Sequence, residues 1–269
     1  MLKNITLGQY FPGDSLIHRL DPRTKLIATV ALIAIVFVVQ GFAGFALIAA
    51  FVLACAASTK IHLKFLFKGL KPLLFIILFT FILNLFFQTG GTPLVALGPV
   101  KITDMGLRMA SFMAVRLILL VVCSQLLTLT TSPIALTDGL ETLFRPLQAI
   151  RFPAHEIAMM MSIALRFIPT LMDEADKIMK AQKARGADFE TGGLIARAKA
   201  MVPLLVPLFV GAFRRAEELA LAMDARCYRG GAGRTRMKQL KFQGIDALAA
   251  LALALLLAAV ILLNRLNVF

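Results

Sequence analysis

The sequence is poor in the residues that build catalytic or metal-binding motifs. Its three cysteines, Cys55, Cys123 and Cys227, are too scattered for a disulfide framework or a metal-ligand spacing, and we interpret them as packing residues. It also contains no GxxxxGK(S/T) phosphate loop, no GxSxG nucleophile turn and no HExxH pair. We therefore expect neither a metal nor a cofactor, and we expect any energy that the protein uses to come from a partner.

Long stretches of the chain lack charge altogether. Of the 269 residues, 59% are hydrophobic, and no charged residue occurs in residues 26–59, 72–100, 117–137 or 247–264. About 20 apolar residues cross a bilayer as a helix, so the first stretch suits two short spans that fold at Gln40-Gly41. The sequence thus predicts an all-α, polytopic membrane protein. We expect a four-span N-terminal domain in residues 1–130, a cytoplasmic coupling-helix domain in 131–244 and a C-terminal transmembrane helix in 245–269.

The positive charge is distributed as membrane topology requires. The formal net charge is +14, and basic residues gather before the first span and between the second and third spans, at Lys60, Lys64, Lys68 and Lys71. Only Lys101 lies between the third and fourth spans. Because cytoplasmic loops are enriched in lysine and arginine, we expect a cytoplasmic N-terminus and an outer C-terminus, with the bilayer and no nucleic acid as partner. Residues 1–24 are polar and predict no signal peptide.

Residues 131–244 predict three helices. Ser132-Pro133 is a helix start, and that helix is expected to end near Arg145-Pro146. Two longer helices are expected, one over residues 154–185 and one over residues 194–226. Gly186 is expected to end the first of them. Both carry internal prolines that should bend them. One apolar stripe recurs in the two long helices at an offset of 41 residues: Ile157, Met161, Ala164, Ile168, Leu171, Ala175 and Ile178, then Ala198, Val202, Leu205, Phe209, Ala212, Ala216 and Leu219.

The uncharged run of residues 202–213 is too short to span a bilayer. We expect it to pack against other helices or to lie at the bilayer face.

Two Ala-x-x-Ala-Arg pentads end at Arg185 and Arg226, again 41 residues apart. An arginine at a helix end commonly does no more than interact with the exposed carbonyl groups there. The alternative is docking, because small flanking alanines leave a guanidinium accessible and its planar fork can bind a carboxylate at two points. The matched pair favours docking, although the spacing by itself leaves both interpretations open.

Other charged residues allow two interpretations each. Arg116 falls in the fourth predicted span, where a charge is a candidate for function, but it can also reach an interface or pair with protein dipoles. Asp173, Glu174 and Asp176 could suggest a metal site, yet on a helix they diverge, and we interpret them as a solvated face.

Three motifs stand out along the chain: His18-Arg19-Leu20-Asp21-Pro22-Arg23-Thr24-Lys25-Leu26, Arg166-Phe167-Ile168-Pro169, and the pair of triplets Ala184-Arg185-Gly186 and Ala225-Arg226-Cys227. Together they resemble the transmembrane T component of energy-coupling factor (ECF) transporters. The resemblance covers nearly the whole chain. The sequence departs from the family pattern at Cys227, where glycine or serine is more familiar.

The resemblance implies a non-catalytic scaffold in the bacterial cytoplasmic membrane. Such a subunit joins two ATP-binding-cassette ATPases, typically a heterodimer of related chains, to a small membrane S component that captures a vitamin or a metal ion. It implies that Arg185 and Arg226, with their flanking residues, each enter a groove of one ATPase. The apolar faces of the two long helices, including Ile168, Leu171, Leu205 and Phe209, would support the S component.

Two functions of other classes are alternatives to this one. A membrane-embedded enzyme with a polar site around Arg116 needs convergent polar groups, which the spacing does not supply. A membrane-anchored nucleic-acid binder needs interleaved basic and aromatic residues, whereas most aromatic residues here are phenylalanines inside predicted spans.

Overall fold

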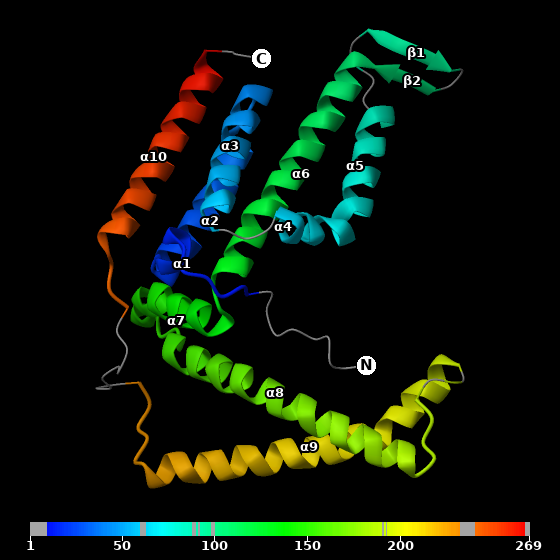
Figure 1. The fold of residues 1–269 in the computed structure, drawn as a ribbon, viewed down its shortest axis with the longest axis vertical. Coiled ribbons are helices and arrows are strands. Elements are labelled where there is room, and N and C mark those ends of the chain that lie inside the picture. The colour runs from blue at the N-terminus through cyan, green and yellow to red at the C-terminus, as the bar shows by residue number, and fades with distance from the viewer. Residues whose placement is uncertain are drawn as a thin grey trace. The chain divides into compact units, whose positions relative to one another are not determined.

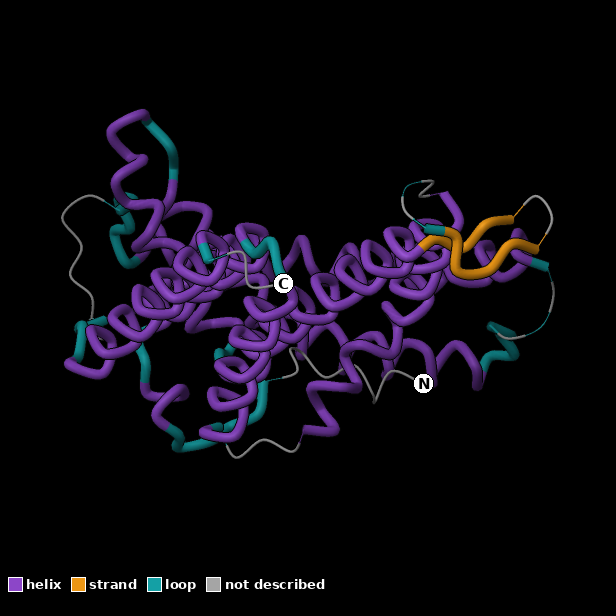
Figure 2. The backbone as a smooth tube through the Cα atoms, turned by 90° about the horizontal axis from the view of Figure 1, so that it is seen from above, coloured by secondary structure: helices purple, strands orange, loops and turns teal. Residues whose placement is uncertain are grey.

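A computed structural model describes residues 10–59, 63–87, 90, 92–97, 100–189, 191, 193–231 and 240–266. The described chain is helical apart from one two-stranded hairpin (Figures 1 and 2). It forms two compact units. The first, called here the span unit, comprises Gly8–Gly139 and Gln239–Phe269; the second, called the arm unit, is described over residues 140–231.

The span unit holds the apolar helices. Its elements are α1 (Leu16–Arg19), α2 (Pro22–Val38), α3 (Phe42–Ser58), α4 (Leu63–Leu70) with a short 3-10 turn (Lys71–Leu73), α5 (Leu74–Phe87), β1 (Pro93–Leu97), β2 (Val100–Thr103), α6 (Asp104–Thr130), the start of α7 (Pro133–Phe144), and α10 (Gly244–Arg265).

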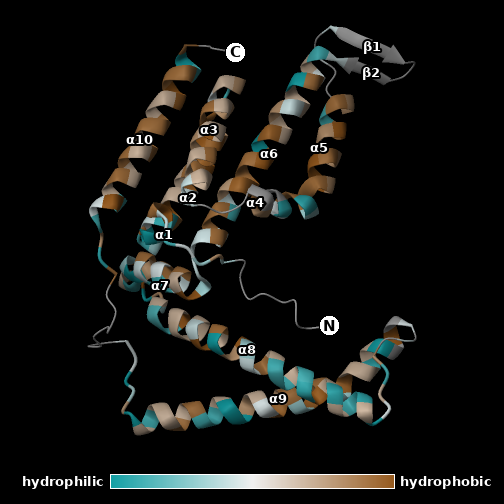
Figure 3. Ribbon diagram, viewed as in Figure 1, coloured by the Kyte–Doolittle hydropathy of each residue, from teal (hydrophilic) through white to brown (hydrophobic). Residues whose placement is uncertain are grey.

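Each of the five expected spans overlaps one helix, namely α2, α3, α5, α6 or α10, and the all-α membrane fold class is confirmed. Within the described residues, three segments are long and apolar enough to cross a bilayer: Lys68–Phe87, Asp104–Thr130 and Gly244–Arg265. Figure 3 shows hydrophobic residues along much of α5 and α10. The helices α2 and α3 have 17 residues each, or about 25 Å, at the short end of what a span needs.

The third and fourth spans differ in extent from the uncharged stretches. The helix α5 ends at Phe87, and an antiparallel hairpin of β1 and β2 follows it, within and just beyond the uncharged residues 72–100. The helix α6 begins at Asp104, because the Thr103 hydroxyl accepts the Gly106 N–H at 3.1 Å and caps it. The uncharged residues 117–137 belong to two helices, since the chain leaves the helical conformation at Thr131 and Pro133 starts α7.

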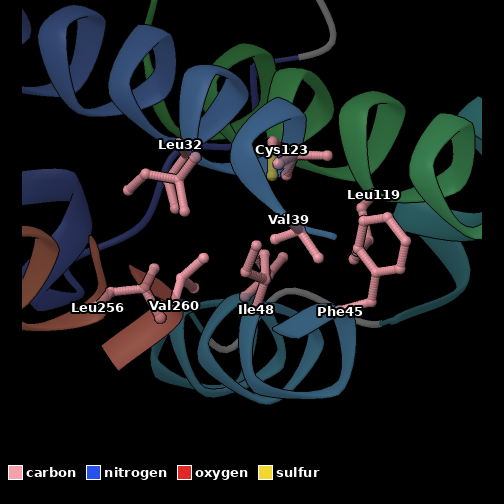
Figure 4. Packing of buried hydrophobic residues seen from close by; sticks show 11 residues of the cluster. Leu32, Val39, Phe45, Ile48, Leu119, Cys123, Leu256 and Val260 are labelled. Carbon is pink, nitrogen blue, oxygen red and sulfur yellow. The ribbon is translucent and has the colours of Figure 1, made fainter. Parts of the chain in front are cut away.

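Four helices of the span unit share one apolar core. The buried side chains of α2, α3, α6 and α10 converge there, as Figure 4 shows for eight of them. The cluster consists of Leu32, Ile35, Val36, Val39, Phe45, Ile48, Val52, Leu119, Cys123, Leu256 and Val260. Cys123 is thus a packing residue, as predicted, and Cys55 is half-buried. That interpretation is wrong for Cys227, which is exposed at a helix end.

A cluster of buried polar groups, which we call the polar clasp, joins three helices at one end of the span unit. A carboxylate oxygen of Asp246, at the start of α10, accepts the backbone N–H of Asp21 at 2.9 Å. The Lys25 ammonium, in the first turns of α2, donates to the carbonyl oxygens of His18 at 3.1 Å and of Thr130 at 3.0 Å. The Asp21–Lys25 part of the N-terminal motif therefore connects α2 to the end of α6 and the start of α10.

The arm unit consists of two long helices and their connections. After α7 ends at Phe144, a 3-10 turn (Arg145–Ile150) leads to α8 (Ala154–Ala184) and then α9 (Leu194–Ala225). The expected helix ends are confirmed to within one residue. Each helix continues through its internal prolines, and Figure 1 shows α9 changing direction between its yellow start and its orange end.

Candidate functional site

The two arginines singled out by the pentads occupy the same position at the ends of α8 and α9. Each follows the last helical residue, Ala184 or Ala225, as the C-cap. The backbone N–H of Arg185 donates to Gln182 O at 3.0 Å, and that of Arg226 donates to Met223 O at 3.1 Å. The last helical turn is therefore completed in the same way at both ends.

The residue after each arginine has a left-handed backbone. Gly186 has φ +89° and Cys227 has φ +55°. The next N–H then reaches back across the helix end: Ala187 N–H donates to Gln182 O, and Tyr228 N–H donates to Met223 O, both at 3.0 Å. This is the Schellman arrangement that commonly ends a helix. These donors and acceptors are related by the 41-residue offset, so the two ends repeat one arrangement, and the Arg185 N–H donates in addition to Ala181 O at 3.2 Å.

The departure at Cys227 does not remove this geometry. A residue with a Cβ atom pays about 1 to 2 kcal/mol for the left-handed conformation, a cost that Gly186 avoids. The turn at Cys227 forms nonetheless, held by its N–H, which donates to Asp224 O at 2.9 Å, and by the following Tyr228 bond. The second turn is therefore equivalent to the first in shape but carries backbone strain.

The six predicted coupling residues are all exposed: Ala184, Arg185, Gly186, Ala225, Arg226 and Cys227. We call Ala184–Gly186 and Ala225–Cys227 the arginine turns. Among the described residues, neither guanidinium makes a hydrogen bond or an ion pair. Each arginine turn thus presents a solvent-accessible cation on a backbone fixed by hydrogen bonds, a form suited to a carboxylate-lined groove.

The four predicted S-component contacts do not share one degree of exposure. Leu205 and Phe209 on α9 are 44% and 61% exposed, whereas Ile168 and Leu171 on α8 are half-buried. Leu204 beside them is buried. The exposed pair belongs to a longer strip, called here the apolar face of α9: Met201, Val202, Leu205, Val206, Phe209, Val210 and Phe213.

Arg116 pairs with groups of the protein itself, which is the second of the two interpretations given above. Its guanidinium donates to Val39 O at 3.2 Å, at the C-terminal end of α2, and lies 4.8 Å from the centroid of the Phe112 ring. The rings of Phe37 and Phe45 also lie within 6 Å. The partly negative carbonyl end of a helix and three aromatic faces stabilise a cation. Arg116 therefore pairs with protein dipoles in the span unit.

Two side-chain contacts between described residues of the arm unit were not foreseen. His155, at the start of α8, contacts the Glu141 carboxylate of α7 at 2.9 Å, and Gly231 packs against its ring. Glu174 of α8 lies 2.5 Å from Arg215 of α9. The interpretation of Glu174 as part of a solvated acidic face is thus wrong, because the crossing of the two helices brings a partner from 41 residues away. Asp173 beside it is exposed, as expected.

Comparison with known proteins identifies the family. A family model described as "Cobalt transport protein" (CbiQ) matches residues 13–239. A protein of Thermosediminibacter oceani, named "Energy-coupling factor transporter transmembrane protein EcfT", is 56% identical over 255 residues, which cover 95% of this chain and 96% of the relative. The chain belongs to the CbiQ/EcfT family.

Further relatives extend the match over almost the whole chain. Proteins with the same name from Clostridium kluyveri and Bacillus subtilis are 54% and 48% identical over 267 and 264 residues. These matches cover 98% of this chain in both cases, and 98% and 100% of the respective relatives. The predicted resemblance is confirmed, and the chain is the transmembrane component of an ECF transporter.

Proposed function

We propose that this EcfT-family chain is the non-catalytic scaffold that transmits ATP hydrolysis from two cytoplasmic ABC ATPases to a membrane S component. The ATPases would form a heterodimer of related chains, and the S component would capture a vitamin or a metal ion. The observation that carries the proposal is the pair of arginine turns, which repeat one backbone geometry and both leave their guanidinium groups exposed. Two equivalent exposed cations suit two equivalent sockets.

The chemistry of the arginine turns favours docking into a protein groove. A guanidinium can bind a carboxylate at two points, and the flanking alanines leave space around it. A carboxylate on each ATPase would then hold one turn, and closure of the ATPase pair on ATP would displace both helix ends.

The apolar face of α9 is the proposed contact for the S component, with Leu205 and Phe209 at its centre and Ile168 and Leu171 contributing from α8. A strip of exposed apolar side chains on a helix whose uncharged run of residues 202–213 is too short to span the bilayer marks an interaction surface. The protein is proposed to lie in the bacterial cytoplasmic membrane, multi-pass, with its N-terminus in the cytoplasm. The basic residues Lys68 and Lys71 would then face the cytoplasm.

Reversal of both cations tests the coupling role. In Arg185→Glu/Arg226→Glu, repulsion would replace attraction at both sockets, and truncating one partner of a buried charge pair typically costs about 2 to 5 kcal/mol. We expect co-purification of the ATPases or ATP-driven uptake to collapse, while the variant still inserts in the membrane. The matched control is Lys180→Glu/Arg229→Glu, which makes the same charge change at exposed positions three to five residues away.

The outcomes separate docking from simple helix capping. Arg185→Lys and Arg226→Lys should be milder, because they keep the charge but lose the two-point contact. If the double glutamate variant binds both ATPases and transports at the normal rate, the arginines only end their helices and the proposal fails.

Charge on the apolar face of α9 tests the S-component contact. Leu205→Asp and Phe209→Asp should weaken retention of the S component while both ATPases still co-purify, since these side chains are exposed. The contrast is Leu204→Asp, where the side chain is 5% exposed and the substitution should instead reduce the amount of folded protein. Normal S-component retention in both exposed variants would exclude this surface.

A further inference from the structure

An ion pair joins α8 and α9 away from the two arginine turns. Glu174 Oε2 lies 2.5 Å from Arg215 Nη2, with the two side chains 27% and 31% exposed. Partial burial strengthens such a pair relative to one in bulk water. Gly211, one turn before Arg215, leaves the space for it: a Cβ atom there would lie 3.0 Å from Glu174 Oε1.

The pair lies at the same distance from both arginine turns. Glu174 precedes Arg185 by 11 residues (185 − 174), and Arg215 precedes Arg226 by 11 residues (226 − 215). At about 1.5 Å per residue, each arm of helix between the pair and its turn is roughly 16 Å long. The contact therefore joins two helix segments of equal length, each of which ends at an arginine turn.

Glu174 and Arg215 are also equivalent positions of the 41-residue repeat (215 − 174). If both repeats carried the same charged residue here, like charges would meet and repel. One repeat carries an acid and the other a base, so the equivalent positions attract. Their neighbours Asp173 and Arg214 carry the same charges but are exposed.

The contact is a charge pair rather than a well-aligned hydrogen bond. Glu174 Oε2 and Arg215 Nη1 are buried without a hydrogen-bond partner among the described residues, although the two charges touch. Attraction between charges depends on distance more than on angle. Such a contact therefore depends less on the relative orientation of the two side chains than an aligned hydrogen bond does.

We propose that Glu174 and Arg215 are positioning residues that hold α8 and α9 at a pivot and thereby set the separation of the two arginine turns. The consequence for transport rests on the proposed coupling function; the positioning itself does not. Without the pair, the angle between α8 and α9 would vary. The two arginine turns would then no longer fit both ATPase grooves at the same time.

The positioning is measured on the full chain in lipid nanodiscs. Spin labels at Lys180 and Leu221 occupy exposed, repeat-equivalent positions (221 − 180) close to the arginine turns. Cys227→Ser removes the exposed native thiol. We expect Glu174→Arg to lengthen and broaden the measured distance distribution, Glu174→Gln to broaden it, and the swap Glu174→Arg/Arg215→Glu to restore it. Asp173→Arg and Arg214→Glu are the matched controls and should leave it unchanged.

The assembled transporter gives the second measurement. Glu174→Arg should lower ATP-driven uptake roughly tenfold while both ATPases still co-purify, and the charge swap should recover most of the rate. An unchanged distance distribution in both Glu174→Gln and Glu174→Arg would overturn the proposed positioning role. A charge swap that fails to restore the original distance distribution would also overturn it. If the distances change as expected but uptake is normal, the pivot stands and the coupling role proposed for the arginine turns is contradicted.

Discussion

Removal of the Asp246 carboxylate should destabilise the span unit, because this side chain accepts two backbone N–H groups at the polar clasp. One belongs to Asp21, at 2.9 Å, and the other to Gln243, at 2.7 Å. Asp246 is 4% exposed and Asp21 is also buried, whereas Gln243 is exposed. In Asp246→Ala, water can replace the carboxylate at Gln243 but has little access to the Asp21 amide.

The expected loss follows from these two contacts. A buried amide left without a partner costs about 1 to 3 kcal/mol. Loss of the reciprocal cap at the start of α10 adds about 1 kcal/mol. The sum of roughly 2 to 4 kcal/mol corresponds to a midpoint lowered by roughly 5 to 15 °C for a chain of this size. Asp246→Asn keeps one carbonyl acceptor and should lose about half as much.

The assay uses the thiols of the chain, because the sequence contains no tryptophan. A dye that reacts with exposed thiols would report unfolding as Cys123, buried in the core, becomes accessible. Cys227 must first be replaced by serine, because it is exposed in the folded chain. Asp173→Ala, at an exposed carboxylate, is the control and should change stability by no more than about 0.5 kcal/mol. An Asp246→Ala midpoint equal to that of the control would refute a stabilising clasp.

Three further results are expected from single substitutions. Thr92→Cys should react with an impermeant thiol reagent in intact cells and Lys71→Cys only after permeabilisation; the reverse pattern would place the N-terminus outside. Cys227→Gly should raise the thermal midpoint, since it relieves about 1 kcal/mol of left-handed strain, and a lower midpoint would show that the thiol contributes packing. Gly231→Ala should reduce the free energy of unfolding by about 1 to 3 kcal/mol and so lower the midpoint, because the methyl group would lie 2.6 Å from His155 Cδ2. An unchanged midpoint would mean that the turn relaxes freely.

Helix ends were predictable where local residues determine them. Pro153 and Gly186 bracket α8, and both act through their own backbone: proline cannot continue a preceding helix, and glycine accepts the left-handed conformation without strain. The equivalent end of α9 was predictable only through the repeat, because Cys227 has no such preference.

The hairpin and the start of α6 were harder to predict, because uncharged sequence does not distinguish a membrane span from a strand. Residues 93–103 are mostly apolar and include four β-branched residues, and their pairing depends on contact between two segments rather than on either alone. Thr103 was the available local signal, since its side chain caps α6.

Partners that lie far apart in sequence could not be assigned to one another. Glu174 and Arg215 are each ordinary charged residues on a helix, and nothing local says that two helices cross there. Arg116 likewise has no complementary residue in its own helix, and its acceptor is the carbonyl group of Val39, which only the folded chain brings near. Pairing across helices is a property of tertiary packing, so single-chain patterns supply candidates but not contacts.

The pairing of the arginines in the fold bears directly on function. Arg23, Arg116 and Arg215 each find a carbonyl group, a carboxylate or an aromatic ring within the chain. Arg185 and Arg226 make no such contact among the described residues, although both stand on turns that the backbone specifies closely. An exposed arginine adds little to stability, so the fold does not account for two copies of one turn with the same unpaired cation. The proposed docking of each turn on one of two similar partner surfaces would account for both.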